Sequence, residues 1–178
     1  KNRINTFFGN GIVAHVGMAD PFCNGVRDII HKTVTELGIN HHFSDTTYVC
    51  IDGPQFSTRA ESKVNRENGF SIVGMTALPE AKLAREAEIC YANISLVTDY
   101  DVWKIGEEVG VEKVLEVMSA NINTCKKLIK QLIPKLAQRE ISCQCGSALK
   151  YAVQSAPETI KKAPSYPALK LLLDKYFK

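Results

Sequence analysis

Short apolar runs alternate with helical patterns along this chain, and this alternation constrains the fold more than any other feature. Runs of strand length cover Ile12 to Met18, Thr46 to Ile51 and Ser71 to Met75. Helical spacing of apolar residues follows the first run from Asp20-Pro21 to Gly38, and another helix is expected to begin at Pro79. Strands that alternate with helices predict an α/β fold with a mixed, mainly parallel sheet flanked by helices.

Two further helices have recognisable sequence signals. Thr58 and Glu61 have the spacing of a capping box, which predicts a polar helix directly after them. The longest helix is expected after Asp101, and Pro134 should bend or end it. Its apolar residues recur at helical spacing, which predicts one buried face made of Val111, Val114, Leu115, Met118, Ile122, Cys125, Ile129 and Leu132.

A carboxylate pair follows the apolar run that begins at Ala92. The run reads as a buried strand, and the strand period of two would point Asp99 and Asp101 to the same side. Ligands of open α/β sheets bind beyond the carboxyl ends of strands, and Tyr100 and Trp103 offer aromatic surface there for a flat ligand. Taken alone, an Asp after a strand is most often a turn former or the N-cap of the next helix.

Two other strand ends carry candidate binding residues. Gly53-Pro54 forces a turn that would present Phe56 and Ser57 at the sheet edge, where an aromatic ring can stack on a base. The alternative is a capping loop with Phe56 in the core. Thr76 ends the third strand before a helix start, where anions bind, although it could equally serve as an N-cap.

Composition indicates an ordinary globular chain. With 178 residues, 45% hydrophobic and 23% charged, one sizeable core is possible. The net charge of +3 comes with scattered basic residues, so no nucleic-acid partner is expected. No apolar run is long enough to span a bilayer and no signal-like segment opens the chain, which favours a cytoplasmic protein without membrane contact. We divide the chain into a domain at 1–149 and a helical tail at 150–178.

Six cysteines are many for such a chain, yet no CxxC pair occurs among them. The sequence therefore predicts no metal site. Cys143 and Cys145 could form a tight disulfide or remain thiols, whereas Cys50 and Cys90 fall in apolar runs typical of isolated buried thiols. Intracellular disulfides are typical of hyperthermophiles, so a paired state would indicate a thermophilic source.

The three strand ends together resemble a known family. The motifs Gly53–Glu61, Gly74–Thr76 with Pro79–Glu80, and Thr98–Asp101 are similar to those of the trimeric nucleoside phosphorylases, and specifically of members that act on 5'-methylthioadenosine. His15 also fits the family. The resemblance extends from the start of the chain to about Leu149 and is strongest to archaeal thermophilic members.

This resemblance implies the nucleoside phosphorylase fold and its reaction. Phosphate, a co-substrate, would attack C1' of 5'-methylthioadenosine and release adenine and 5-methylthioribose 1-phosphate, without a cofactor. Asp99 would donate a proton to purine N7 as a general acid, and ionised Asp101 would accept from the 6-amino group. Members that act on 6-oxopurines carry Asn at the position of Asp99, so the resemblance implies a 6-aminopurine.

The family's other site residues carry over by position. Phe56 and Ser57 would line the base pocket, and Met75 would lie under the ribose. Thr76 would bind phosphate, and Val111 and Val114 would line the pocket near the methylthio group. His15 would contribute to a neighbouring subunit's pocket. On the same analogy Cys23 would pair with Cys90, and Cys143 with Cys145.

One part of the family pattern has no counterpart. The N-terminal third, which carries most phosphate ligands in the family, matches nothing here, so we expect residues 1–178 alone to be inactive or poorly folded. The implied assembly is a homo-oligomer, a trimer or a dimer of trimers, that includes the missing segment. Two alternatives stay open: a phosphorylase of broader 6-aminopurine range, or a non-catalytic subunit of such an assembly.

Overall fold

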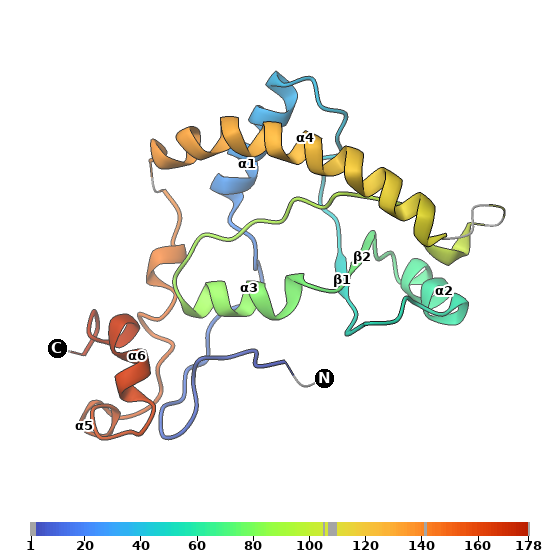
Figure 1. Cartoon of the computed structure of the whole chain (residues 1–178). Helices are drawn as coiled ribbons and strands as arrows, with labels where there is room; N and C mark the ends of the chain where they lie inside the picture. Colours follow the sequence, from blue (N-terminus) through green and yellow to red (C-terminus); the bar gives the residue numbers. More distant parts are fainter. Residues whose placement is uncertain (1–2, 105, 107–109, 141, 178) are drawn as a thin grey trace. The chain divides into compact units, whose positions relative to one another are not determined.

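The computed structural model describes residues 3–104, 106, 110–140 and 142–177 (Figure 1). The chain divides into two compact units, each built from separated segments. The first contains Lys1–Arg27, Leu78–Ala92 and Ile141–Lys178, and the second contains Asp28–Ala77 and Asn93–Glu140. Helices together with a small parallel sheet confirm the α/β class. The domain boundary at residue 149 stays a prediction.

The second unit contains the sheet. Strand β1 (Tyr48–Cys50) pairs in parallel with β2 (Ile72–Gly74), and Cys50 lies opposite Gly74 at their carboxyl ends. Helix α2 (Arg59–Glu67) connects the two strands. The predicted strands at Thr46 to Ile51 and Ser71 to Met75 are therefore confirmed, and so is their parallel arrangement.

Helix α2 begins at the predicted capping box. The Glu61 backbone N–H donates to Thr58 Oγ1 at 3.2 Å, and the Thr58 N–H donates to a Glu61 carboxylate oxygen at 2.7 Å. The bond from the Thr58 N–H, and a second bond that the Thr58 hydroxyl donates to the same carboxylate oxygen at 2.8 Å, lower the pKa of Glu61. The start of the helix is thus fixed by local chemistry that the sequence reveals.

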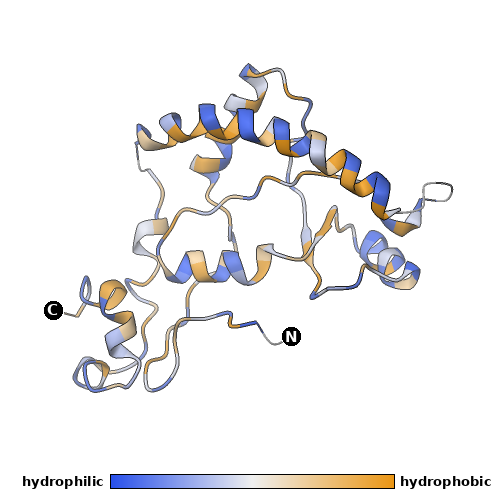
Figure 2. Ribbon diagram, viewed as in Figure 1, coloured by the Kyte–Doolittle hydropathy of each residue, from blue (hydrophilic) through white to orange (hydrophobic). Residues whose placement is uncertain are grey.

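Helix α4 (Val111–Ala137) contains Pro134, where the prediction expected it to bend or end. It continues three residues past Pro134, so it does not end there. Its apolar face is also largely exposed instead of buried: Leu128 and Leu132 are buried, whereas Val111, Leu115, Met118, Ile122 and Ile129 are exposed. A helix of this length extends about 40 Å, whereas a three-residue strand covers about 10 Å, so the sheet cannot cover it. Figure 2 shows hydrophobic residues alternating with hydrophilic ones along α4.

The first unit is mainly helical. It contains the short turn η2 (Cys145–Ser147), α5 (Pro157–Ile160) and α6 (Tyr166–Leu173). It also contains all of α3 (Ala77–Glu86) except its first residue, which belongs to the second unit. Helix α1 (Asn24–Glu36) starts in this unit, at Asn24 instead of the predicted Asp20-Pro21. The tail packs against the N-terminal segment in a cluster of buried residues: Ile12, Ile160, Ala163, Leu169 and Leu173.

Two predicted strands are wrong. Residues 12–18 form only two isolated bridges, one between Gly9 and Ile12 and one between Ala14 and Val153, and the segment around Val153 consists of turns. The apolar run from Ala92 to Thr98 is not in a strand either, and Leu96 and Val97 are exposed. A strand needs a hydrogen-bonded neighbour, and no segment that the structure describes pairs with this run. Among the described residues, no helix combines the length and the apolar character that a bilayer crossing requires.

Candidate functional site

The carboxyl ends of β1 and β2 lie side by side and position the first candidate residues. The Ile51 N–H donates to the Gly74 carbonyl at 2.9 Å, so both strands end at the same edge. Gly53 follows with a positive φ of 66°, and a Cβ at this position would meet Met75 Sδ at 2.7 Å. Glycine therefore allows the loop after β1 to lie directly against Met75.

Phe56 and Ser57 lie on the loop between β1 and α2. The Phe56 side chain is 57% exposed, so the alternative that places it in the core is wrong. Ser57 and Met75 are half-buried, and Thr76 is exposed. An exposed ring can stack on the face of a flat ligand, and a half-buried hydroxyl or thioether can contact its edge.

Asp99 and Asp101 form a turn after the apolar run. The Asp101 N–H donates to Asp99 Oδ1 at 2.8 Å, and the Thr98 hydroxyl donates to Asp99 Oδ2 at 2.6 Å. Asp101 has a φ of 58°, and its Oδ1 accepts from the Val102 N–H at 2.8 Å. The strand argument for their orientation therefore does not hold, and the turn-forming role is real. Each carboxylate oxygen still has acceptor capacity for a ligand.

The turn that carries the acids is attached to α2. Arg59 donates from Nη1 to the Val102 carbonyl at 2.7 Å, and the Arg66 guanidinium stacks over the Trp103 ring at 3.8 Å. Lys104 Nζ lies 3.8 Å from the centre of the Tyr100 ring. Both aromatic rings predicted as ligand surface thus have a cation on one face. Because α2 also follows the Phe56 loop directly, it ties the two candidate segments together.

The remaining predicted residues lie elsewhere. Val111 and Val114 begin α4 in the second unit, and the α4 residue Asn121 donates to the Val97 carbonyl at 3.0 Å, just before the acidic turn. His15 lies in the first unit, where its N–H donates to the Ala152 carbonyl at 2.8 Å. Every predicted base, ribose and phosphate contact is therefore in the second unit.

Comparison with known proteins assigns the family. The family model described as "Phosphorylase superfamily" matches residues 1–134, three quarters of the chain. The chain belongs to the phosphorylase superfamily.

Relatives within this superfamily have specific names. An S-methyl-5'-thioadenosine phosphorylase of Geobacter sulfurreducens is 46% identical over 152 residues, which is 85% of this chain and 52% of the relative. Among solved structures, a methylthioadenosine phosphorylase from an Antarctic soil metagenomic library has a TM-score of 0.85 at 40% identity, covering 97% of this chain and 61% of that one. Methylthioadenosine phosphorylase from Schistosoma mansoni in complex with adenine has a TM-score of 0.79 at 31% identity, with coverages of 86% and 62%.

The chain thus spans little more than half the length of these phosphorylase relatives. The sequence motifs nevertheless identified the superfamily and its fold correctly. Sequence reasoning missed the contribution of Arg59 and Arg66, since an arginine on a polar helix gives no signal of its distant partner.

A second cluster of reactive side chains lies in the first unit. The four sulfur atoms of Cys23, Cys90, Cys143 and Cys145 all lie within 4.8 Å of one another. A contact of 3.4 Å joins the sulfurs of Cys90 and Cys143, which is neither of the pairs that the resemblance implies. The disulfides and the thermophilic source stay predictions. This four-sulfur group is the arrangement best suited to a metal among the residues that the structure describes.

Proposed function

We propose that this chain carries the base-binding part of a 5'-methylthioadenosine phosphorylase. Phosphate would attack C1' of the substrate, forming a C1'–O bond while the C1'–N9 bond breaks. The electron pair of that bond stays on the purine, which leaves as adenine after gaining a proton. The observation that carries the proposal is the attachment of the Phe56 loop and the acidic turn to one helix, α2, in a chain whose relatives are named for this substrate.

The acidic turn would recognise and activate the base. Asp99 would donate to N7 as the purine gains electron density, and Asp101 would accept from the 6-amino group. Asp101 Oδ1 is held by the Val102 N–H, which leaves Oδ2 to meet the amine. Adenine in the complex of the Schistosoma mansoni relative supports a purine ligand for this fold.

The other contacts would surround the sugar. Phe56 and Ser57 would line the base pocket and Met75 would lie under the ribose, since Gly53 lets the loop approach its sulfur. Thr76 would bind phosphate, Val111 and Val114 would line the methylthio end, and His15 would serve a neighbouring subunit. The assembly would be a trimer or a dimer of trimers, with inorganic phosphate as co-substrate and no cofactor in the reaction.

Adenine release tests the activity. The natural protein that contains this chain should release adenine from 5'-methylthioadenosine only when phosphate is present, with equimolar 5-methylthioribose 1-phosphate. Adenosine turned over equally well would indicate the broader 6-aminopurine enzyme. Absence of phosphorolysis of every 6-aminopurine nucleoside, with the protein folded and assembled, would contradict the proposal and favour a non-catalytic subunit.

A further inference from the structure

The four-cysteine cluster is assembled from three segments of the first unit. Cys23 immediately precedes α1 and Cys90 follows α3, while Cys145 is the first residue of η2 and Cys143 lies two residues before it. Cys23 and Cys145 are buried, and the other two are half-buried. Within the segments that the structure describes, these four are the residues that meet the geometry of a possible metal site.

The sulfur separations are of the size that a tetrahedral ion requires. Zinc bound by thiolates lies about 2.3 Å from each sulfur, which places the four sulfurs of a tetrahedron about 3.8 Å apart. The observed separations all lie within 4.8 Å, with 3.4 Å for Cys90 and Cys143, so shifts of about 1 Å or less would bring each of them to this value. We propose that Cys23, Cys90, Cys143 and Cys145, in their reduced form, bind one zinc ion as a closed tetrathiolate site.

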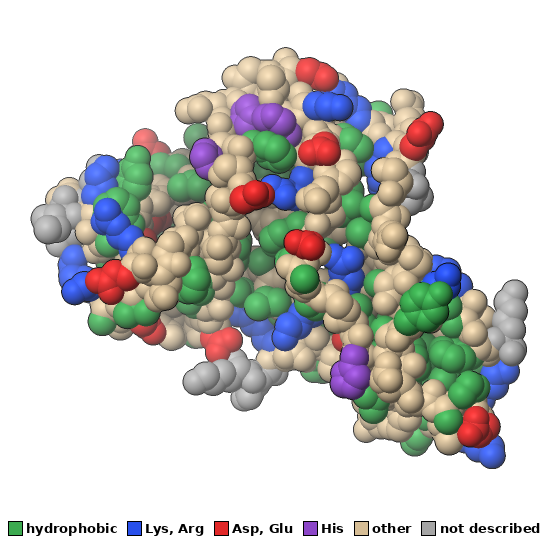
Figure 3. Space-filling view, turned by 180° about the vertical axis from the view of Figure 1, so that it is seen from behind, with side chains coloured by type: hydrophobic (Ala, Val, Ile, Leu, Met, Phe, Trp, Pro, Cys, Tyr) green, Lys and Arg blue, Asp and Glu red, His purple; other side chains and the backbone are tan. Residues whose placement is uncertain are grey.

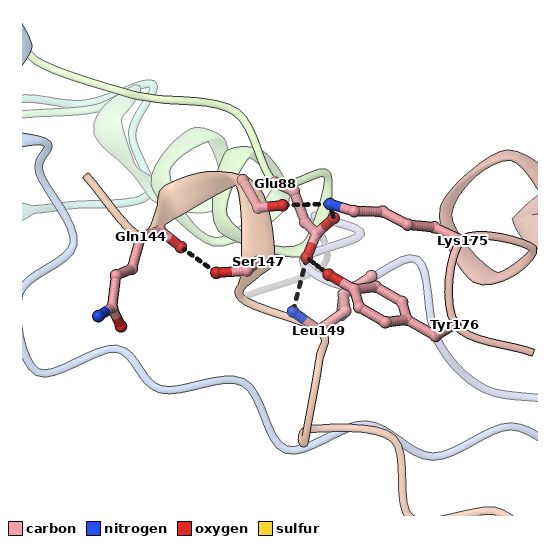
Figure 4. Close-up of polar contacts among 7 residues, drawn as sticks. Glu88, Gln144, Ser147, Leu149, Lys175 and Tyr176 are labelled. Atoms are coloured by element: carbon pink, nitrogen blue, oxygen red, sulfur yellow. Dashed lines mark hydrogen bonds and ion pairs between the residues drawn. The ribbon is translucent and has the colours of Figure 1, made fainter. Parts of the chain in front are cut away.

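The three ligand-bearing segments are already held together by hydrogen bonds. The Cys23 N–H donates to the Tyr91 carbonyl at 2.7 Å, which joins the first segment to the second. Glu88 accepts from the Leu149 N–H at 2.9 Å and from the Tyr176 hydroxyl at 2.5 Å, which joins the second segment to the third (Figure 4). The Ser147 hydroxyl donates to the Gln144 carbonyl and closes the turn around Cys145. The ligands are therefore positioned before any ion binds.

The sulfur of Cys143 also has a backbone donor. The Cys145 N–H donates to it, which ties the two ligands of the CxC pair together. Cysteine binds zinc as the thiolate, so any ligand that is still protonated would lose its proton to solvent on binding, without any redox change.

A cation also lies near the ligands. Lys175 forms an ion pair with Glu88 at 2.9 Å and donates to the carbonyl of Gly146, the residue after Cys145. Four thiolates leave no open position for water, so the site would be structural. It thus contributes folding energy to the first unit and is independent of the proposed reaction.

Zinc stoichiometry tests the proposal. The natural protein, reduced and then freed of reductant without oxygen, is mixed with zinc and passed through a desalting column. We expect one zinc per chain, released when a mercurial reagent titrates the thiols, and cobalt in its place should give sulfur-to-metal charge-transfer absorption. Less than stoichiometric zinc, or cobalt without that absorption, would overturn the proposal, as would two disulfides that persist through reduction.

Single substitutions locate the site. Cys143→Ser should weaken zinc binding by more than the roughly 10- to 100-fold that outer-sphere partners contribute. Cys125→Ser, on α4 in the second unit, is the matched control and should leave it unchanged. Equal zinc affinity in both variants would contradict the assignment. If Cys143→Ser fails to fold, the cobalt absorption of the unmodified protein still decides the result.

Discussion

The acidic turn of the second unit and the cysteine cluster of the first are held in opposite ways. Asp99 and Asp101 bond mostly to residues within two positions of themselves, and the arginines of α2 anchor their turn from a distance. The cysteines meet because bonds between distant segments bring them together, above all those to Glu88. A locally stabilised turn can lose a carboxylate and keep its shape. The cysteine cluster, by contrast, forms only if all three segments that carry its cysteines stay in place. Changes in the turn should therefore affect catalysis, and changes around the cluster should affect stability.

The largest effect is expected from Asp99→Asn. The amide keeps an oxygen for the Asp101 N–H but cannot transfer a proton to N7, so kcat/KM for 5'-methylthioadenosine should fall by about 10² to 10⁴. The free energy of unfolding should change little. Asp28→Asn on α1 makes the same chemical change at an exposed position. Steady-state kinetics that are equal for both variants would remove Asp99 from the mechanism.

Glu88→Ala should have the opposite effect to Asp99→Asn: it should lower stability and leave the activity of the folded protein unchanged. It removes an acceptor that is only 8% exposed and leaves the buried Leu149 N–H without this partner, which costs about 1 to 3 kcal/mol. Glu88 also has a φ of 57°, so Glu88→Gly should lose the same bonds yet be less destabilised than Glu88→Ala. Urea unfolding measures both, and the kcat of the folded enzyme should be unchanged. A Glu88 variant with an unchanged free energy of unfolding but reduced activity would contradict the contrast between the two regions.

Acid should weaken the first unit through the same residue. Burial raises the pKa of Glu88, but bonds from Tyr176, the Leu149 N–H and Lys175 outweigh it and hold the pKa below its usual value. The folded-state pKa is thus below the unfolded one, so this stabilisation is present above about pH 4.3 and is lost as the pH falls through the folded value. The unfolding free energy of Glu88→Gln should lack this part of the pH dependence. If the unfolding free energies of the unmodified protein and of Glu88→Gln changed with pH in the same way, Glu88 would not be the source of this pH dependence.

A smaller effect is expected at the capping box. Thr58→Ala removes the acceptor for the Glu61 N–H at the start of α2 and should cost about 1 kcal/mol of stability. Thr58→Ser keeps the acceptor and serves as the control. Thermal unfolding measures this loss of stability. Because α2 anchors the acidic turn through Arg59, the KM of the folded Thr58→Ala variant should also rise modestly.

The features that the sequence predicted correctly depend on nearby residues. The capping box of Thr58 and Glu61 and the parallel β1–α2–β2 arrangement follow from local patterns. The run after Ala92 has the composition of a strand, but a strand depends on its neighbour, and the exposed apolar face of α4 likewise depends on what lies beside it. Hydrophobic side chains also reach the surface on the face shown in Figure 3.

The same distinction applies to the sites. The strand-end residues were found because each motif is contiguous in the sequence. The cysteine cluster was not, because it combines a CxC pair with two single cysteines whose proximity depends on contacts such as the one between Cys23 and Tyr91. The stacking of Arg66 on Trp103 was missed for the same physical reason.

Adenine binding tests the central claim, that the acidic turn recognises the base, most directly. In Asp101→Asn, the amide oxygen keeps the Val102 N–H, a side-chain amide tolerates the positive φ, and the NH₂ group then faces the 6-amino group, donor against donor. Titration calorimetry with the natural protein should show adenine binding that Asp101→Asn weakens at least about tenfold, the cost of a charged hydrogen bond of about 1.5 kcal/mol. Unchanged adenine affinity in Asp101→Asn would contradict the account.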